Sequence, residues 1–154
     1  QPMKPSGYAC SAHKFPISAS GSFKTSVRQT LDNVVDQIEV VNGPITAAQL
    51  AGYGARGLIV VRGEEIRPRM DVQPGFWTAT MATQATMVAS VSVDGKHGRV
   101  FGTTVEGQGM GNAEAGGACE GGAKAIAQAA GQAMKDAMRK IGEAISNSER
   151  IRGA

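Results

Sequence analysis

The sequence WTATMATQATMVASVSV spans residues 77–93, and its side chains alternate in character along the whole stretch. Apolar and small side chains fill most odd positions, whereas Thr, Ser and Gln fill most even ones. Successive side chains of a strand point to opposite faces, so this period of two predicts one long strand with one buried face. Asp94-Gly95, followed by Lys96-His97-Gly98, predicts a turn. Residues 99–106 are expected to return as the antiparallel partner.

A long helix is predicted from about residue 120 to residue 147. Ile126, Ala130, Met134 and Ala137 recur every three or four residues, which is the spacing of one helical face. Several glycines fall inside this helix, and each costs up to about 1 kcal/mol relative to alanine. Such a sequence is tolerated where one backbone must approach another closely. We therefore expect the helix to close the fold over the apolar face of the long strand.

Two shorter helices are predicted in the first third of the chain. Apolar side chains at Phe23, Val27 and Leu31 share one helical face, which predicts a helix over residues 23–34 with Ser22 as its N-cap. Residues 46–51 form a second short helix in this interpretation. Gly52 and Gly54 follow it and are expected to end it.

Further strands are predicted at residues 6–12 and 37–41. The apolar run Leu58–Val61 is typical of a strand buried on both faces, and a weaker continuation reaches Asp71. Pro68 in that continuation indicates an edge or a bend. The glycine-rich residues 107–112 are expected to be a flexible joint before the last helix.

Together these elements predict the α+β class. We expect a single domain over residues 6–150 behind a disordered leader at residues 1–5. Its sheet should be mixed and contain the long antiparallel hairpin. The helices should pack on one face, and the long C-terminal helix should be among them.

The inventory of reactive side chains does not favour an enzyme or a cofactor site. The two histidines, His13 and His97, fall in predicted loops, and no pair of Cys and His residues has the spacing of metal ligands. Glu64 and Glu65 are adjacent in a predicted strand, so we expect them on opposite faces rather than as a pair for acid–base chemistry. No catalytic, cofactor-binding or metal-binding residue is predicted.

Basic residues exceed acidic ones only slightly, giving a net charge of +3. This excess does not require a nucleic-acid partner. The densest basic group contains Arg62, Arg67 and Arg69, with acidic residues interspersed. The group is either a mixed, solvated strand edge or a contact site for an anion.

Two pairs of residues are singled out for other reasons. Cys10 and Cys119 could form one disulfide, which requires an oxidising compartment, but two buried unpaired thiols are an equal alternative. Phe76 and Trp77 are adjacent at a strand start, so one of the two rings should lie at the surface. A surface aromatic there is a candidate for a protein interface, as are Arg62, Arg67 and Arg69.

Several motifs resemble those of small bacterial envelope lipoproteins of the YajG type and the auxiliary lipoproteins of ABC-type transport systems. The motifs are Gly7-Tyr8, the stretch from Gly21-Ser-Phe to Leu31-Asp-Asn-Val-Val, GARGLIVV at residues 54–61, the hairpin up to Gly107, and AMKDAMRKI at residues 133–141. The fold of that family is similar to the N-terminal domain of the translocation protein TolB.

The resemblance implies a non-catalytic subunit or partner in a bacterial envelope assembly or transport system. It implies export to the periplasm and tethering to the outer membrane by a lipid anchor that this chain does not contain. Envelope proteins, or a second copy of the chain, are the implied partners. The alternative, suggested by the arginine group, is a periplasmic domain that binds a small or anionic ligand such as a lipid or a glycan.

Overall fold

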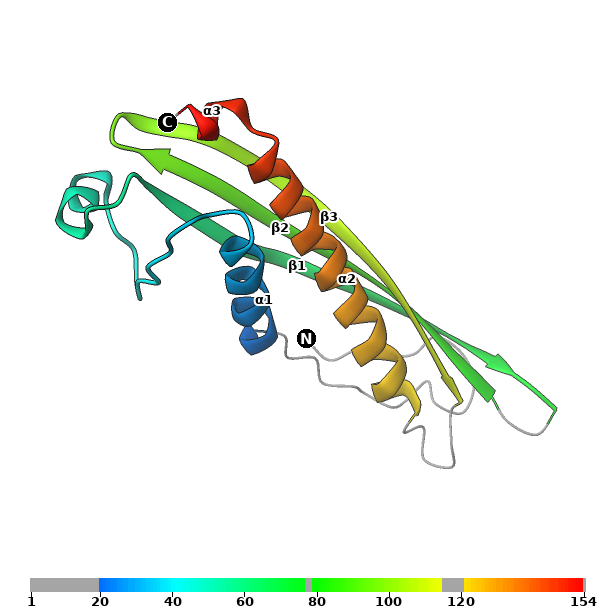
Figure 1. Ribbon diagram of the computed structural model, residues 1–154. Helices are drawn as coiled ribbons and strands as arrows, with labels where there is room; N and C mark the ends of the chain where they lie inside the picture. The colour runs from blue at the N-terminus through cyan, green and yellow to red at the C-terminus, as the bar shows by residue number, and fades with distance from the viewer. Residues whose placement is uncertain (1–19, 77–78, 115–120, 154) are drawn as a thin grey trace.

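Three long strands form the centre of the fold, and each pairs with its neighbour in the chain (Figure 1). This computed structural model describes residues 20–76, 79–114 and 121–153. The strands are β1 (Gly57–Pro74), β2 (Ala79–Gly95) and β3 (Gly98–Glu114), paired antiparallel in the order β1-β2-β3. The helical elements are α1 (Ser20–Asp32), the 3-10 helix η1 (Ala47–Tyr53), α2 (Gly121–Ser146) and the short α3 (Glu149–Arg152).

Strand β2 confirms the predicted alternation. Its odd positions from Met81 to Val93 are all buried, whereas its even positions are half-buried or exposed. The buried face meets α2, whose small and aliphatic residues form most of the core with it. Helices α1 and α2 lie on this same face of the sheet (Figure 1). The single α+β domain and its long C-terminal helix are therefore as predicted.

Helix α2 rests directly on the backbone of β3. A Cβ atom on Gly107 would lie 2.1 Å from the carbonyl oxygen of Ala133, and one on Gly109 would lie 2.1 Å from that of Ala129. Gly111 has the same relation to Ala125. Two residues of strand advance about 6.7 Å and four residues of helix about 6.0 Å, so the two repeats stay nearly in step.

The contact between α2 and β3 corrects the prediction of a flexible joint at residues 107–112. These residues belong to β3, and their glycines are required by the closeness of the helix rather than by a loop. The glycines alternate with Gln108, Met110 and Asn112, so the segment keeps the period of two that a strand needs.

Strand predictions in the first part of the chain fare less well. Residues 37–41 are irregular, and Gly43 with a φ of 95° follows them. This segment pairs with none of the described strands, although the outer edge of β1 is open, and an extended segment without a partner strand cannot satisfy its own backbone. Residues 6–12, with the leader at 1–5, lie outside the described residues. Within the described chain the sheet is therefore wholly antiparallel, not mixed.

Strand β1 is longer and more exposed than predicted. Leu58–Val61 are half-buried rather than enclosed on both faces, because β1 is an edge strand of the described sheet. Pro68 lies within the strand, which an edge tolerates because the missing N–H need not serve a neighbour. The edge position that Pro68 predicts is confirmed.

The helix ends follow the sequence in part, because Gly52, expected to end the second helix, lies inside η1, and α1 covers Ser20–Asp32 rather than residues 23–34. Helix α2 and the turn at Asp94–Gly98 match their predictions, and Gly54 caps η1 with a φ of 64°. Helix α1 begins at Ser20, so Ser22 is not its N-cap. The hydroxyl of Thr25 donates to the carbonyl oxygen of Gly21 at 3.2 Å, which shows that the backbone is already helical there.

Candidate functional site

The predicted arginine group lies on the face of β1 that points away from the helices. Arg67 forms an ion pair with Glu65 at 2.8 Å, and Arg69 forms one with Asp71 at 3.6 Å. The hydrogen bond from Arg67 lowers the pKa of Glu65, and the pKa of Arg67 is raised by the same bond. Two of the three positive charges are therefore compensated on the strand itself. This arrangement favours the mixed, solvated edge, and the contact with an anion stays an untested prediction.

A β-bulge corrects the expectation for the two adjacent glutamates. The pairing of β1 with β2 shifts between Gly63 and Glu65, so Glu64 is an additional residue without a partner of its own. The hydroxyl of Ser90, on the outer face, donates to Glu64 Oε1 at 2.6 Å, and Glu65 lies opposite the outward-facing Val88. Both carboxylates thus share the outer face. They are exposed and the pKa of Glu65 is lowered, which does not suit a general acid.

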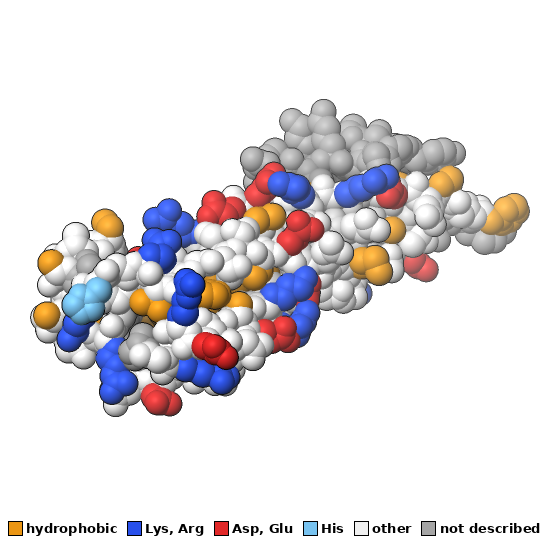
Figure 2. Space-filling view, turned by 90° about the horizontal axis from the view of Figure 1, so that it is seen from above, with side chains coloured by type: hydrophobic (Ala, Val, Ile, Leu, Met, Phe, Trp, Pro, Cys, Tyr) orange, Lys and Arg blue, Asp and Glu red, His pale blue; other side chains and the backbone are white. Residues whose placement is uncertain are grey.

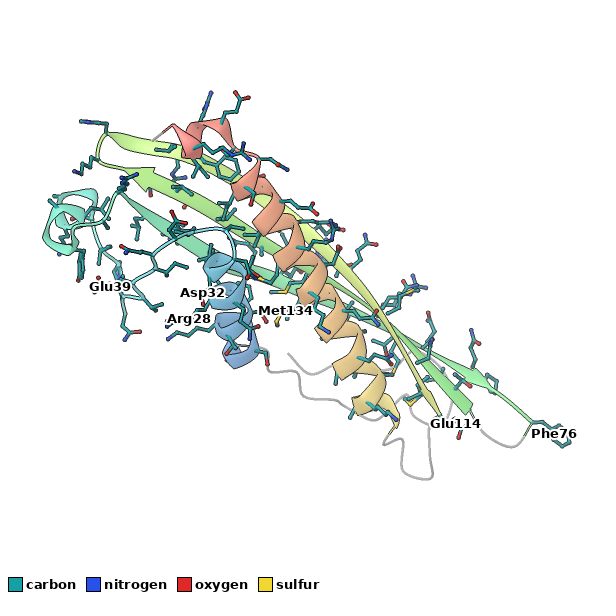
Figure 3. All side chains as sticks on the ribbon, in the orientation of Figure 1. Arg28, Asp32, Glu39, Phe76, Glu114 and Met134 are labelled. Carbon is teal, nitrogen blue, oxygen red and sulfur yellow. The ribbon has the colours of Figure 1, made fainter. Side chains whose placement is uncertain are left out.

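Phe76 is 89% exposed and lies where the β1–β2 hairpin extends furthest from the helices (Figure 3). Its predicted role in an interface stays a prediction. Trp77, the other aromatic residue of this pair, lies outside the described residues, as do Cys10 and Cys119. The predicted disulfide is therefore not tested.

A groove of about 1570 Å³ lies at the opposite end of the sheet. Phe23 of α1 lies over Gly63, with its ring 3.5 Å from where a Cβ of that glycine would be. Beyond this point the inner face of β1, where Ile59 and Val61 are half-buried against the edge of the core, becomes the floor of the groove. The walls are α1 on one side and the irregular residues 33–46 on the other, and η1 closes one end.

The groove is lined mainly by aliphatic and aromatic side chains, below called the apolar groove. They are Phe23, Val27, Leu31, Val34, Val35, Ile38, Val40, Val41, Ile45, Leu50, Tyr53, Leu58, Ile59, Val61, Val93, Val100, Ile145 and Ile151. Val40 and Tyr53 are each 46% exposed, which is unusual for side chains gathered in one concave site. Contiguous apolar surface of this kind marks interaction sites in soluble proteins.

A second, smaller pocket of about 420 Å³ adjoins the apolar groove at the β2–β3 turn. Its lining includes the cations Arg56, Lys96 and Arg99 and also His97, and it is below called the basic pocket. Arg99 donates to Asp94, which compensates its charge. Figure 2 shows hydrophobic side chains lying open among Lys and Arg side chains at this end of the molecule, on the left of the view.

Other kinds of site find little support within the described ranges. No three His, Cys, Asp or Glu side chains among those residues come together as metal ligands. Each helix of the described chain is too short or too polar to cross a bilayer. Comparison of the chain with protein-family models, with curated proteins and with solved structures finds no match. The resemblance to envelope lipoproteins therefore stays a prediction from the motifs quoted above.

The sequence had not indicated the apolar groove. Three of its lining residues, Ile38, Val40 and Val41, belong to the segment that the sequence predicts as a strand. A signal did exist, because apolar residues also continue beyond the proposed strand end at Asn42-Gly43-Pro44. Apolar side chains on both sides of a chain break are more typical of an open surface than of one short strand.

Proposed function

We propose that this chain is a non-catalytic interaction domain that binds a segment of a partner protein in the apolar groove. The observation that carries the proposal is the set of apolar side chains left open along α1, residues 33–46 and β1. The volume of the groove exceeds the roughly 300–1,000 Å³ of pockets that enclose drug-sized ligands. An open groove of this size fits a helix-in-groove mode of recognition better than a small molecule.

The proposed setting is a bacterial cell-envelope assembly or transport system. In this proposal the chain acts in the periplasm and is tethered to the outer membrane by a lipid anchor outside this chain. Its partners are envelope proteins, a second copy of the chain among them. The setting rests on the motif resemblance alone and is independent of the groove.

The groove is tested by placing a photo-crosslinking amino acid at position 53 or at position 110 of the full chain. Tyr53 lines the groove, whereas Met110 is a matched control: it is 62% exposed and apolar but lies on the outer face of β3. We expect an adduct with one defined protein from position 53 and none from position 110. Equal labelling from both positions, or none from position 53, would contradict the proposal.

A variant pair completes this test. Val40→Glu puts a charge into the groove at a half-exposed position and should abolish the crosslink from position 53. Met110→Glu should leave it intact. The compartment is tested separately by fractionating cells that express the complete gene product. Recovery in the cytosol alone would remove the envelope setting and leave the groove proposal standing.

A further inference from the structure

The apolar groove and the basic pocket form one continuous surface. Arg56, Gly95 and Val100 line both of them. The groove is uncharged along most of its floor, and its boundary with the pocket is marked by the guanidinium of Arg56. A ligand that fills the groove therefore meets the cations of the turn at one end and mainly apolar side chains along the rest, with charged side chains of α1 and of the connecting segment on the walls.

The positive charge in the basic pocket is largely uncompensated. Arg56 and Lys96 are exposed, and neither forms an ion pair with any residue that the structure describes. Arg152 lines the same end of the groove, and its guanidinium donates to a backbone carbonyl, that of Ser146, rather than to a carboxylate. Asp94 is the acidic residue at the turn, and it is already bonded to Arg99.

The tight turn holds these cations in place. Gly98 has a φ of +115°, and a Cβ on Gly95 would lie 3.1 Å from a methyl group of Val100. Lys96 and His97 are thus carried on a short connection between two long paired strands, and Arg56 directly precedes the first residue of β1. A cluster supported by strand ends loses less entropy on binding than one on a free loop.

The acidic residues that line the groove come from another element. Asp36 and Glu39 belong to the segment between α1 and η1, on which Figure 3 labels Glu39. The groove therefore has uncompensated cations at the β2–β3 turn and carboxylates on the connecting segment, while Lys24 and Arg28 line its α1 wall, where Arg28 is paired with Asp32.

We propose that the partner segment is an apolar helix with an acidic end, and that this end lies in the basic pocket against Arg56 and Lys96. The inference rests on the proposed function and deepens it by naming the chemistry of the partner. Carboxylates would accept charge-assisted hydrogen bonds there. If the acidic residues are at the C-terminus of the helix, its own dipole adds to the attraction.

The test uses synthetic fluorescent peptides of about three to four helical turns and the full chain. All peptides share one leucine-rich face, and they differ only in a C-terminal Glu-Glu, Gln-Gln or Lys-Lys. Fluorescence anisotropy measures the Kd of each. We expect the Glu-Glu peptide to bind roughly tenfold more tightly than the Gln-Gln peptide at low salt, and the Lys-Lys peptide more weakly than both. This difference should shrink at about 1 M salt, where the Debye length falls to about 3 Å.

Charge variants assign the effect to the pocket. Arg56→Gln together with Lys96→Gln should remove the preference for the Glu-Glu peptide while the Gln-Gln peptide still binds. Arg62→Gln is the matched control, because Arg62 is an exposed arginine on the outer face of β1 and makes no ion pair with described residues. It should leave the preference unchanged. Circular dichroism confirms that each variant is folded, and Arg56→Gln alone serves if the double variant is not.

The outcomes separate the two proposals. If no peptide binds, the proposed function fails and this inference fails with it. If the Glu-Glu and Gln-Gln peptides bind equally, the inference is overturned and the proposed function stands. If a fatty acid such as oleate binds and every peptide fails to, the site takes a lipid and both proposals are wrong. Loss of the preference in Arg62→Gln would also overturn the assignment to the basic pocket.

Discussion

The two edges of the sheet are protected in opposite ways. Along β3, side chains of α2 reach the strand backbone: the N–H of Gln108 donates to Asp136 at 3.1 Å, and the N–H of Met110 donates to Gln132 at 3.1 Å. Gln128 accepts from the N–H of Asn112 in the same way. Helix α2 therefore covers that edge. It lies so close to the glycines of β3 that no further side chain fits between them.

The β1 edge has no such cover among the described residues. It carries a bulge at Glu64, a proline at position 68 and charged side chains of both signs, which are the features that discourage a second sheet from pairing with an exposed edge. Near its start, Leu58, Ile59 and Val61 take part in the apolar groove. The comparison teaches that the α2–β3 side holds the fold together, whereas the β1 side is left accessible for binding.

The largest effect should come from filling the contact between α2 and β3. Gly109→Val places a side chain where a Cβ alone would lie 2.1 Å from one helix carbonyl and 2.4 Å from a helix amide nitrogen. The helix must move away, so we expect a loss of unfolding free energy of about 3 kcal/mol or more. Urea denaturation followed by circular dichroism measures it.

Gly102→Val on the same strand is the matched control. A Cβ there would meet only the flexible side chain of Arg99, at 3.6 Å, and a carbonyl at 4.0 Å. Valine suits a strand, so this variant should be neutral or slightly more stable. Equal losses in both variants would show that α2 does not rest on β3 as described.

A gain of stability is expected beneath the same helix. The hydroxyl of Thr83 is buried and has no hydrogen-bond partner among the described residues. Thr83→Val replaces it with a methyl group of similar size, and we expect a gain of about 1 kcal/mol in unfolding free energy. Thr86→Val, at a half-buried position on the outer face, should change little. A loss in Thr83→Val would reveal that the hydroxyl has a partner.

A smaller loss should follow from uncovering one backbone group of β3. Gln132→Ala removes the acceptor for the N–H of Met110. Water can reach this exposed bond, and alanine is a slightly better helix former, so the expected loss is only about 0.5 kcal/mol. Gln29→Ala on α1 is the control for helix propensity, because none of the described residues forms a hydrogen bond with that side chain. Equal losses in the two variants would show that the bond between Gln132 and the N–H of Met110 does not contribute to stability.

The last prediction concerns pH. Hydrogen bonds from Lys140, from Arg139 and from the N–H of Gln108 hold the pKa of Asp136 well below its ordinary value. A carboxyl group with a lowered folded-state pKa stabilises the protein above its unfolded pKa of about 3.9 and loses this effect as pH falls further. Asp136→Asn should therefore flatten the decline of the urea midpoint below about pH 4. An unchanged decline would mean that Asp136 is not linked to folding.

Sequence reasoning succeeded where a period was long and uninterrupted. The alternation of residues 79–93 and the helical spacing from Ile126 onward were each sufficient, because every residue repeats the same constraint. Residues 107–112 show where it failed. The glycine content predicts a flexible joint there, but glycine at every second position of β3 complements alanine at every fourth position of α2. Only the two segments together carry that information.

The apolar groove could not be predicted from the sequence for a different reason. Val40 and Tyr53 are exposed because of where residues 33–46 and η1 settle against β1, and no local pattern determines that placement. The bulge at Glu64 is similar. A one-residue shift in pairing is set by the partner strand, so two adjacent glutamates were expected on opposite faces when they in fact share one.

The three glycines of β3 also determine how α2 is aligned along the strand. Because the contact between α2 and β3 repeats at equal intervals, the helix could in principle shift along the strand by one repeat. Such a shift moves four residues of α2 past two residues of β3. Such a shift would bring Val105 or Ala113, the flanking positions on the same face, under a helix carbonyl where even a Cβ has no space. The three glycines, flanked on both sides by residues that carry a Cβ, thus allow only one alignment of α2 along β3. Val105→Gly would add a fourth glycine to this series and would allow α2 a second alignment along β3.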